Sequence, residues 1–385
     1  MSTQSAPSRA FIDLGAYVHN ISVIRKLVGP RVHIMAVVKA NAYGHGLIPI
    51  AKAACAAGID MLGVATVEEG AELRQAGITH PILVLFQPEP SALPPILEYN
   101  LAVMIADTDT AVKLGELARA ANRVVSVHCQ IDSGMGRQGF SLEKAPEDLQ
   151  FLTRISHVDI QGVATHFPAA DQPEDAFTLE QIRIFKNLLK QLSRQGTPYE
   201  VAHAANSAAI VNYPQSYFDM VRPGLMTYGV WPTKNRPTHC PLRPVLRWET
   251  TVTQVRSLPA GASISYGRTF TAPAPMNVAI LPVGYADGFS HHLSNRGYVL
   301  IRGTRCAVLG AVCMDQTVVD VTHLPGLQPG EPVTLIGADD SEHITPETLA
   351  ELAETIPYEI LTGIGARVRR IYLEPGGKPV EAAAS

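Results

Sequence analysis

The stretch HIMAVVKANAYGHG, residues 33–46, joins an apolar run, Ile34 to Val38, to a lysine and a glycine-rich turn segment. A short aliphatic run that ends at Asn and Gly signals is typical of a buried strand. Lys39 follows the run directly, and a lysine at a strand end is most often just the first solvated residue. If Lys39 is buried instead, desolvation lowers its pKa and frees the amine to attack a carbonyl group.

Similar runs recur along the chain from about Val32 to Pro223, and helical patterns separate them. This alternation is typical of parallel strands joined by crossover helices, and eight such units close naturally into a barrel. We predict strands at 33–38, 61–65, 82–85, 102–105, 124–131, 160–164, 199–202 and 220–222. We predict helices at 48–57, 67–76, 110–120 and 179–195, among others.

The sequence changes character after Gly229, where prolines become frequent and short β-type runs follow. This change indicates a linker that leads into a β module. A helix is predicted to begin at Thr345-Pro346, and an alternating strand at 367–372. We therefore expect an α/β protein with a TIM-like (β/α)8 barrel at 13–240, a mainly β domain at 241–385, and a strand within 1–12 that joins this second domain. The linker prolines are Pro232, Pro237, Pro241 and Pro244.

Composition excludes several classes of function. Apolar residues make up 46% of the chain and charged residues 17%, with a net charge of -4 and no basic cluster. These values favour a globular enzyme over a protein that binds nucleic acid or an anionic membrane. No targeting segment or membrane span is evident, so we expect a cytoplasmic protein. The five cysteines show no zinc-type or disulfide-type spacing.

Polar residues follow the predicted barrel strands at the ends where the active site of such a barrel lies. Taken singly, each has an ordinary structural explanation, such as a hydrogen-bonded core histidine or a loop cation. Their convergence on one rim favours a common site. These residues are Lys39, Arg137, His166, the segment 203–207 and Arg222.

Two segments of this rim are suited to an anion. Asn206-Ser207 precedes a helical run and could cap it, or its side chains could help to bind a phosphate. Gly224, just after Arg222, lets backbone amides approach an anion closely, although a turn glycine is the simpler interpretation. The loops after strands seven and eight are the usual phosphate site of this barrel, which fits a phosphorylated cofactor.

Several motifs, including residues 36–46, resemble those of the pyridoxal phosphate-dependent alanine racemase family. The resemblance extends over nearly the whole chain and implies an alanine racemase that uses pyridoxal 5'-phosphate. It would supply D-alanine for peptidoglycan or serve alanine catabolism. The other motifs are Ile131 to Arg137, His203 to Ser207, Arg222 to Gly224, Ser265 to Gly267, Gly284 to Gly288 and Val312 to Gln316.

The resemblance also implies residue roles. Lys39 would form the aldimine and act as one acid/base group, and Tyr266 would act as the other from the partner subunit of a homodimer with shared active sites. Two groups are needed because racemisation removes a proton from one face of Cα and returns it on the other. The implied cofactor-binding residues are Lys39, Tyr43, His166, Asn206, Ser207, Arg222, Gly224, Leu225 and Tyr358. The implied residues around the amino-acid substrate are Arg137, Met314, Asp315 and Tyr285.

One position departs from the family pattern. Many relatives carry a carbamylated lysine where this chain has Gln130, and its negative charge helps to orient the substrate-binding arginine. A neutral amide can accept a hydrogen bond from Arg137, but it is a weaker acceptor than a charged group. We therefore expect substrate affinity or selectivity to differ from the family norm.

Other functions remain compatible with parts of the sequence. A serine or broad-specificity racemase of the same architecture is the nearest alternative. A decarboxylase would be expected to carry an acidic residue where Arg222 stands, and a non-catalytic pyridoxal phosphate-binding protein would not need the β module. A metal hydrolase lacks support because His166 and His203 belong to no paired histidine motif, and we expect no metal.

Overall fold

The computed structural model describes residues 7–233 and 241–374, which divide into two compact units. One unit contains the described residues of 17–42 and 47–243, and the other contains 7–16, 43–46 and 244–374. Residues 1–6 of the predicted N-terminal strand segment lie outside the described residues, as do Pro237 and Cys240.

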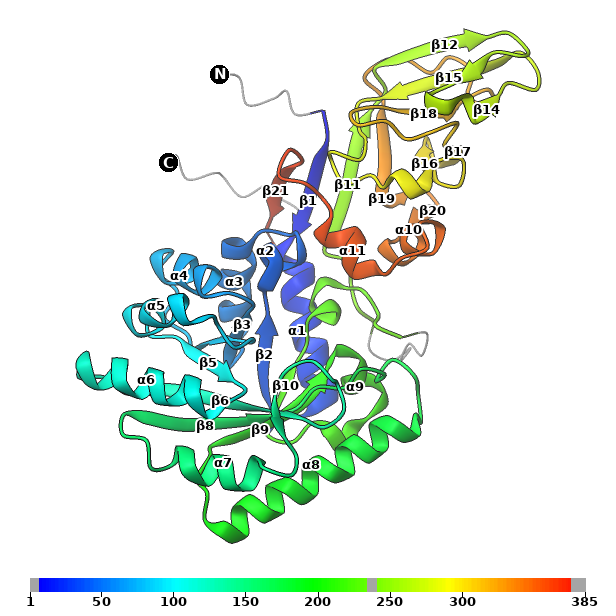
Figure 1. Cartoon of the computed structure of the whole chain (residues 1–385). Helices are drawn as coiled ribbons and strands as arrows, with labels where there is room; N and C mark the ends of the chain where they lie inside the picture. Colours follow the sequence, from blue (N-terminus) through cyan, green and yellow to red (C-terminus); the bar gives the residue numbers. More distant parts are fainter. Residues whose placement is uncertain (1–6, 234–240, 375–385) are drawn as a thin grey trace. The chain divides into compact units, whose positions relative to one another are not determined.

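The first unit is a closed barrel. Among the described residues, eight parallel strands pair in the ring order β5-β4-β3-β2-β10-β9-β8-β6, and pairing of β5 with β6 closes the ring (Figure 1). The predicted fold class, a barrel followed by a mainly β domain, is confirmed. The barrel strands are β2 (His33–Val37), β3 (Met61–Val64), β4 (Ile82–Val84), β5 (Ala102–Ile105), β6 (Val125–Asp132), β8 (Val158–Ala164), β9 (Val201–Asn206) and β10 (Met220–Arg222).

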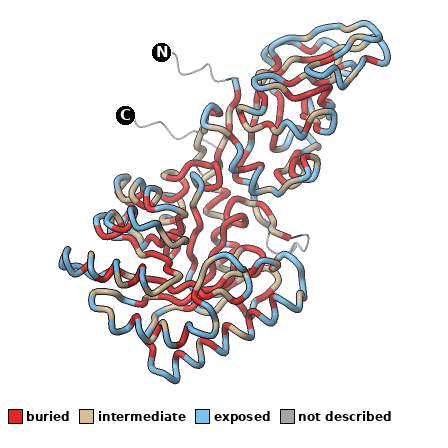
Figure 2. The backbone as a smooth tube through the Cα atoms, viewed as in Figure 1, coloured by how far each residue is buried: buried red, intermediate tan, exposed pale blue. Residues whose placement is uncertain are grey.

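Helices cover the outside of the barrel, so its strands are buried on both faces and read as continuous apolar runs. The helices themselves alternate buried and exposed faces (Figure 2). The longest, α8, is capped by Asp175 at its start and ends at Gly196 in a left-handed conformation. The helices are α1 (Leu14–Val28), α3 (Leu47–Ala56), α4 (Val67–Gln75), α5 (Leu93–Glu98), α6 (Thr108–Ala120), α7 (Ala145–Leu152), α8 (Ala176–Gln195) and α9 (Ser207–Asn212).

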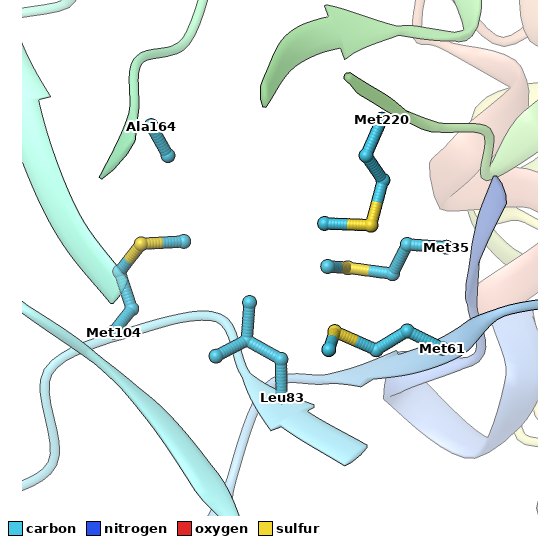
Figure 3. Close-up of a cluster of buried hydrophobic side chains, with 6 residues drawn as sticks. All are labelled: Met35, Met61, Leu83, Met104, Ala164 and Met220. Atoms are coloured by element: carbon cyan, nitrogen blue, oxygen red, sulfur yellow. The ribbon is translucent and has the colours of Figure 1, made fainter. Parts of the chain in front are cut away.

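The barrel interior is filled by side chains from six of its strands (Figure 3). Four of the six are methionines, whose flexible thioethers fill irregular spaces. The interior is therefore a packed core that supports the strand ends, as in other barrels of this kind. The cluster consists of Met35, Met61, Leu83, Met104, Ala164 and Met220.

Several predicted strand ends are wrong by one to four residues, and two of these errors affect residues of the predicted site. The seventh strand was expected at 199–202, with His203 in the loop beyond it, but β9 runs from Val201 to Asn206. His203 is fully buried within β9, because its ring nitrogens have hydrogen-bond partners inside the barrel. The first strand was expected to reach Val38, but β2 ends at Val37, and Lys39 begins a turn.

The second unit is built mainly from strands. Strand β1 pairs antiparallel with β11 and parallel with β21, so the N-terminal segment belongs to the main sheet of this unit. The described strands of that sheet are β17 (Thr304–Ala307), β16 (Tyr298–Ile301), β19 (Pro332–Asp339), β11 (Leu246–Thr251), β1 (Arg9–Asp13) and β21 (Arg369–Leu373), with β20 (Glu342–Ile344) beside β19. Smaller sheets contain β12 (Gln254–Leu258), β15 (Met276–Leu281) and β18 (Thr317–Asp320), and β13 (Ser263–Ile264) with β14 (Phe270–Thr271).

Two helices interrupt the β unit. The predicted helix at Thr345-Pro346 is confirmed as α10 (Pro346–Leu352), and the Thr345 side chain caps it. A second helix, α11 (Pro357–Thr362), follows it. Across residues 7–233 and 241–374, no helix is long and apolar enough to cross a membrane.

The barrel core yields a stability prediction. Replacing the fully buried Leu83 with Ala should destabilise the protein by about 2–5 kcal/mol, because apolar contacts are lost and a cavity remains. The Leu179→Ala variant is the matched control, since Leu179 on α8 is 42% exposed. Urea unfolding of both variants measures the difference. Equal losses would contradict the assignment of Leu83 to the packed core.

Candidate active site

Lys39 opens a left-handed turn, α2 (Lys39–Tyr43), at the carboxyl end of β2. Ala40, Asn41 and Ala42 have φ values of 54°, 53° and 52°. This conformation costs non-glycine residues roughly 1–2 kcal/mol each, so the surroundings must hold it in place. The strained turn fixes the direction in which the Lys39 side chain leaves the strand.

Two side chains of the barrel unit hold this turn. Glu69 accepts a hydrogen bond from the Ala40 amide at 2.6 Å and a second from the Ala65 amide at 2.8 Å. Asn41 accepts a hydrogen bond from the Leu47 amide at 2.8 Å, which ties the turn to the start of α3. These bonds offset part of the backbone strain beside Lys39.

The Lys39 amine lies in a half-buried, cationic environment. Burial lowers the pKa of Lys39, and the Arg137 guanidinium lowers it further, while the Glu69 carboxylate opposes the change. The amine lies 5.0 Å from the ring centre of Phe86, and the Arg137 guanidinium lies 5.2 Å from the same ring. The lowered pKa increases the fraction of free amine, which is the form that acts as a nucleophile or base.

Arg222 carries a buried charge at the end of β10, where only 7% of its surface is exposed. Its guanidinium donates to His203 Nδ1 at 2.7 Å, to His166 Nδ1 at 3.2 Å, and to the carbonyl oxygens of Thr165 and Ala204. No carboxylate of the described chain forms an ion pair with it. Burial lowers the pKa of Arg222 to about 10, so the group stays charged at neutral pH.

A directed chain of hydrogen bonds continues from Arg222 into the barrel. Because His203 Nδ1 accepts from Arg222, His203 Nε2 carries the proton and donates to His128 Nδ1 at 2.8 Å. His128 Nε2 then donates to Gln161 at 3.3 Å. Gly162 makes room for this contact, since a Cβ there would lie 2.1 Å from His128 Nδ1.

The histidines of this network are neutral at physiological pH. Burial lowers the pKa of His128 to about 4, with the Arg222 charge acting in the same direction. Burial, and then Arg222, lower the pKa of His166 to about 3 and place that of His203 well below its usual value. Neutral imidazoles can accept hydrogen bonds from Arg222 without adding charge to the site.

Backbone amides converge on Ser207 at the end of β9. The Gly224 and Met226 amides donate to the buried Ser207 hydroxyl oxygen at 2.9 and 3.3 Å. Leu225 is buried beside them. Asn206 caps α9, because its side chain accepts from the Ala209 amide at 3.0 Å. Because both amides donate to the Ser207 oxygen, the Ser207 hydroxyl proton is left to donate to an anion such as a phosphate.

Tyr266 and Tyr285 belong to loops of the β unit that are joined to residues 311–313. Tyr266 begins the short helix η4 (Tyr266–Arg268), and 76% of its surface is exposed. The preceding Ser265, at φ 62°, donates to the Ala311 carbonyl at 2.6 Å. The Tyr285 amide donates to the Cys313 carbonyl at 3.0 Å. The unit therefore presents both tyrosines from adjoining loops.

Met314 and Asp315 belong to this loop cluster as well. The Ala286 amide donates to the Met314 carbonyl at 3.1 Å. Arg367 bridges Asp315 and Asp287, with N–O distances of 2.8 and 3.2 Å. Asp315 is therefore paired within the unit, and the exposed Met314 side chain lies beside it in sequence.

Tyr43 and Tyr358 come together within the β unit, since residues 43–46 group with it. Their ring centres are 5.9 Å apart, and Tyr43 is buried. Gly44 keeps this region compact, because its φ is +80° and a Cβ would lie 2.3 Å from the Leu361 carbonyl oxygen. Both predicted cofactor-binding tyrosines are thus neighbours.

Gln130 is buried on β6, and its amide nitrogen donates to the Ile131 carbonyl at 3.3 Å. Arg137 is exposed, and in the described chain it forms no hydrogen bond with Gln130. The hydrogen bond that the Gln130 amide could accept from Arg137 is not formed among the described residues. The short Gln130 side chain instead forms a hydrogen bond with the backbone of its own strand.

Three contributors were missed by sequence reasoning: Phe86, Glu69 and His128. The spacing Thr66 to Glu69 is a capping-box signal, which predicts that Glu69 accepts a hydrogen bond from the Thr66 amide; in the structure Glu69 accepts from the Ala65 amide instead. Nothing in the sequence around Phe86 or His128 indicates their contacts with residues far along the chain. In the described residues, no group of three or more His, Cys, Asp or Glu is placed to hold a metal ion.

The fold and the site define a class of two-domain barrel enzymes. In this class a closed (β/α)8 barrel is joined to a β domain, and the carboxyl rim of the barrel carries a desolvated lysine and a buried arginine. The chain matches "Alanine racemase, N-terminal domain" over residues 12–232 and "Alanine racemase, C-terminal domain" over residues 245–372. The chain belongs to the alanine racemase family. The reaction of this family interconverts L-alanine and D-alanine, and the chain is an amino-acid racemase.

Individual relatives agree with this assignment. The chain is 43% identical to the alanine racemase of Symbiobacterium thermophilum, with 95% of this chain and 97% of the relative covered. It is 41% identical to that of Halothermothrix orenii, again with coverage of 95% and 97%. The structure of the Clostridium difficile 630 alanine racemase matches with a TM-score of 0.94, 33% identity and 98% coverage of each chain.

A further structure connects the family to a cofactor. The alanine racemase of Bartonella henselae, described with covalently bound pyridoxal phosphate, matches with a TM-score of 0.86 and 31% identity. The match covers 96% of this chain and 100% of that chain.

The buried histidines yield a pH prediction. The folded-state pKa of His128, about 4, lies below the unfolded value near 6.5, so the unfolded chain gains protons first as the pH falls. Stability should therefore decrease from pH 7 to pH 5, and His128→Gln should reduce this decrease by about 2 kcal/mol. Urea unfolding at both pH values measures the effect, and the exposed His292→Gln is the control. An unchanged pH dependence in His128→Gln would refute the assignment.

Proposed function

We propose that this racemase binds pyridoxal 5'-phosphate through the Lys39 amine and exchanges the Cα proton of alanine between Lys39 and Tyr266. The observation that carries the proposal is the lowered pKa of Lys39, caused by burial and by Arg137, at the carboxyl rim of the barrel. When bound, the cofactor withdraws electrons from the attached amino acid and makes its Cα–H acidic. The protein residues then supply binding, orientation and proton transfer.

The residues present fit such a cofactor. The Ser207 hydroxyl, whose oxygen accepts from the Gly224 and Met226 amides, can donate its own proton to the phosphate group. Tyr43, Tyr358, Asn206 and Leu225 complete the proposed cofactor-binding set.

Arg222 would face the pyridine nitrogen, with His166 beside it. Because Arg222 is a permanent cation, it would donate a hydrogen bond to that nitrogen and would not protonate it. The three neutral histidines preserve this state, since none offers Arg222 a negative charge. The ring nitrogen would then stay unprotonated, which limits how much charge the cofactor withdraws from the substrate.

The substrate carboxylate would be bound by Arg137 and the Met314 amide, with Asp315 in the same loop and Tyr285 at the entrance. Arg137 forms no ion pair within the described residues, so its guanidinium is free to bind a carboxylate in bidentate fashion. A narrow entrance favours the methyl side chain of alanine over larger ones, by about 1–3 kcal/mol per methylene.

We further propose a homodimer in which Tyr266 serves the active site of the partner subunit. The described part of the β unit exposes five large hydrophobic residues that a second subunit could cover: Tyr266, Tyr285, Met314, Ile356 and Tyr358. Covering these residues with a second subunit would remove them from solvent. The proposal also includes a cytoplasmic location and the supply of D-alanine for peptidoglycan or alanine catabolism.

Racemisation itself gives the direct test of the activity. Incubating the chain with L-alanine and pyridoxal phosphate in D2O should remove the optical rotation and place deuterium at Cα. Serine and larger amino acids provide a substrate panel that separates an alanine enzyme from a broad-specificity racemase. Rotation that persists for alanine but disappears for serine would contradict the proposed substrate.

The Tyr266→Phe variant tests the second proton-transfer group. Loss of a positioned acid/base group typically slows the reaction by about 10²–10⁴-fold, so racemisation should fall by that range. Tyr298→Phe, in β16, is the matched control and should retain activity. A Tyr266→Phe enzyme with normal turnover would exclude Tyr266 as a proton carrier.

Mixing two inactive variants tests the shared site. If Lys39 of one subunit works with Tyr266 of the other, a heterodimer of Lys39→Ala and Tyr266→Phe contains one intact site. Random exchange of equal amounts should restore about a quarter of wild-type activity. If both residues came from the same subunit, every site would lack one of them and the mixture would remain inactive.

A further inference from the structure

Phe86 is the ring that two cations of the active site share. The Lys39 amine and the Arg137 guanidinium lie 5.0 and 5.2 Å from its centre, both within the range of a cation–π interaction. Among residues 7–233 and 241–374, neither cation forms an ion pair with a carboxylate. The phenyl ring is therefore the common contact of two like charges that repel each other.

The backbone holds Phe86 firmly at this position. The preceding Leu85 amide donates to the Val64 carbonyl at 2.8 Å, which extends the pairing of β4 with β3 beyond its last residue. The following Gln87 accepts from the Ala106 amide at 2.6 Å and donates to Asp107 at 2.5 Å. Phe86 is thus fixed on both sides, and its half-buried ring is held at the carboxyl rim.

A neutral aromatic ring has a property here that other side chains lack. A carboxylate between Lys39 and Arg137 would favour the protonated amine and would occupy the guanidinium by ion pairing. An aliphatic side chain would offer neither cation any electrostatic attraction. The negative face of a phenyl ring attracts both cations yet leaves the Arg137 donors available to another ligand.

We propose that Phe86 is a positioning residue that holds Lys39 and Arg137 close together through cation–π contacts while leaving both free to react or bind. The inference rests on the proposed roles of these two residues in cofactor attachment and carboxylate binding. Phe86 itself transfers no proton and acts only through the two cations that it contacts. Its function is to set the distance between the amine and the carboxylate-binding group.

The test replaces Phe86 with fluorinated phenylalanines that keep its shape but weaken the negative ring face: 4-fluoro, 3,5-difluoro and pentafluoro. The full-length chain, stripped of pyridoxal phosphate, is labelled with acetic anhydride between pH 6 and 11, and mass spectrometry follows Lys39. The measured quantity is the labelling rate at pH 7 divided by the plateau rate at high pH. This ratio reports the fraction of free amine and is independent of access to the reagent.

We expect the ratio to rise steadily with fluorination and to reach about two- to five-fold in the pentafluoro variant and in Phe86→Leu. Phe86→Trp should restore the wild-type ratio or lower it, because tryptophan has the strongest ring face. Phe151→Leu, at an exposed position on α7, is the matched control. A ratio that does not change across the fluorinated series would overturn the proposal.

A second readout uses the enzyme with its cofactor bound. Loss of the contact with Arg137 should raise KM for alanine in Phe86→Leu by about two- to five-fold with a smaller change in kcat. A two- to five-fold fall in kcat without a change in KM would also overturn the proposal. The labelling ratio requires no turnover, so its failure is distinguishable from failure of the racemase proposal, in which the wild-type enzyme would not act on alanine.

Discussion

The pairing of β5 with β6 closes the barrel, and the active site depends on this closure. The register sets Met104 opposite His128 and completes the ring of strands. Because all the strands run in the same direction, their carboxyl ends meet on one rim. Lys39, Phe86, Arg137 and Arg222, which are far apart in sequence, reach the same region only for this reason. The methionine-rich interior supports the rim from below.

Electrostatics distinguishes this rim from an ordinary cluster of charges. Arg222 is buried without a carboxylate partner in the described chain, and a buried charge of this kind normally costs stability. Neutral histidines and backbone carbonyl groups accept hydrogen bonds from the guanidinium instead. Because Arg222 can only donate, His203 Nδ1 must accept, and this fixes the direction of the hydrogen bonds that follow. Burial, and then the Arg137 charge, keep the pKa of Lys39 low, although the Glu69 carboxylate opposes them. The site is therefore suited to an anionic cofactor and to the carboxylate group of an amino acid.

Much of the fold could be predicted from the sequence, because periodicity and turn residues are local signals. The strand at Ala102–Ile105 was predicted with both its ends, since apolar runs bounded by loops determine it. His203 was misplaced in a loop, because a buried polar residue depends on partners such as His128 that local patterns do not reveal. Phe86 was missed for the same reason. The left-handed turn after Lys39 is held by Glu69 of α4 and by the bond from the Leu47 amide at the start of α3 to Asn41, and neither contact can be read from the local sequence.

We propose that pyridoxal phosphate attaches to the Lys39 amine. Treating the protein with pyridoxal phosphate, reducing it with borohydride and mapping the peptides by mass spectrometry tests this directly. One phosphopyridoxyl group on the peptide that contains Lys39, and none elsewhere, is the predicted result. A label on another lysine, or no label at saturating cofactor, would contradict the account.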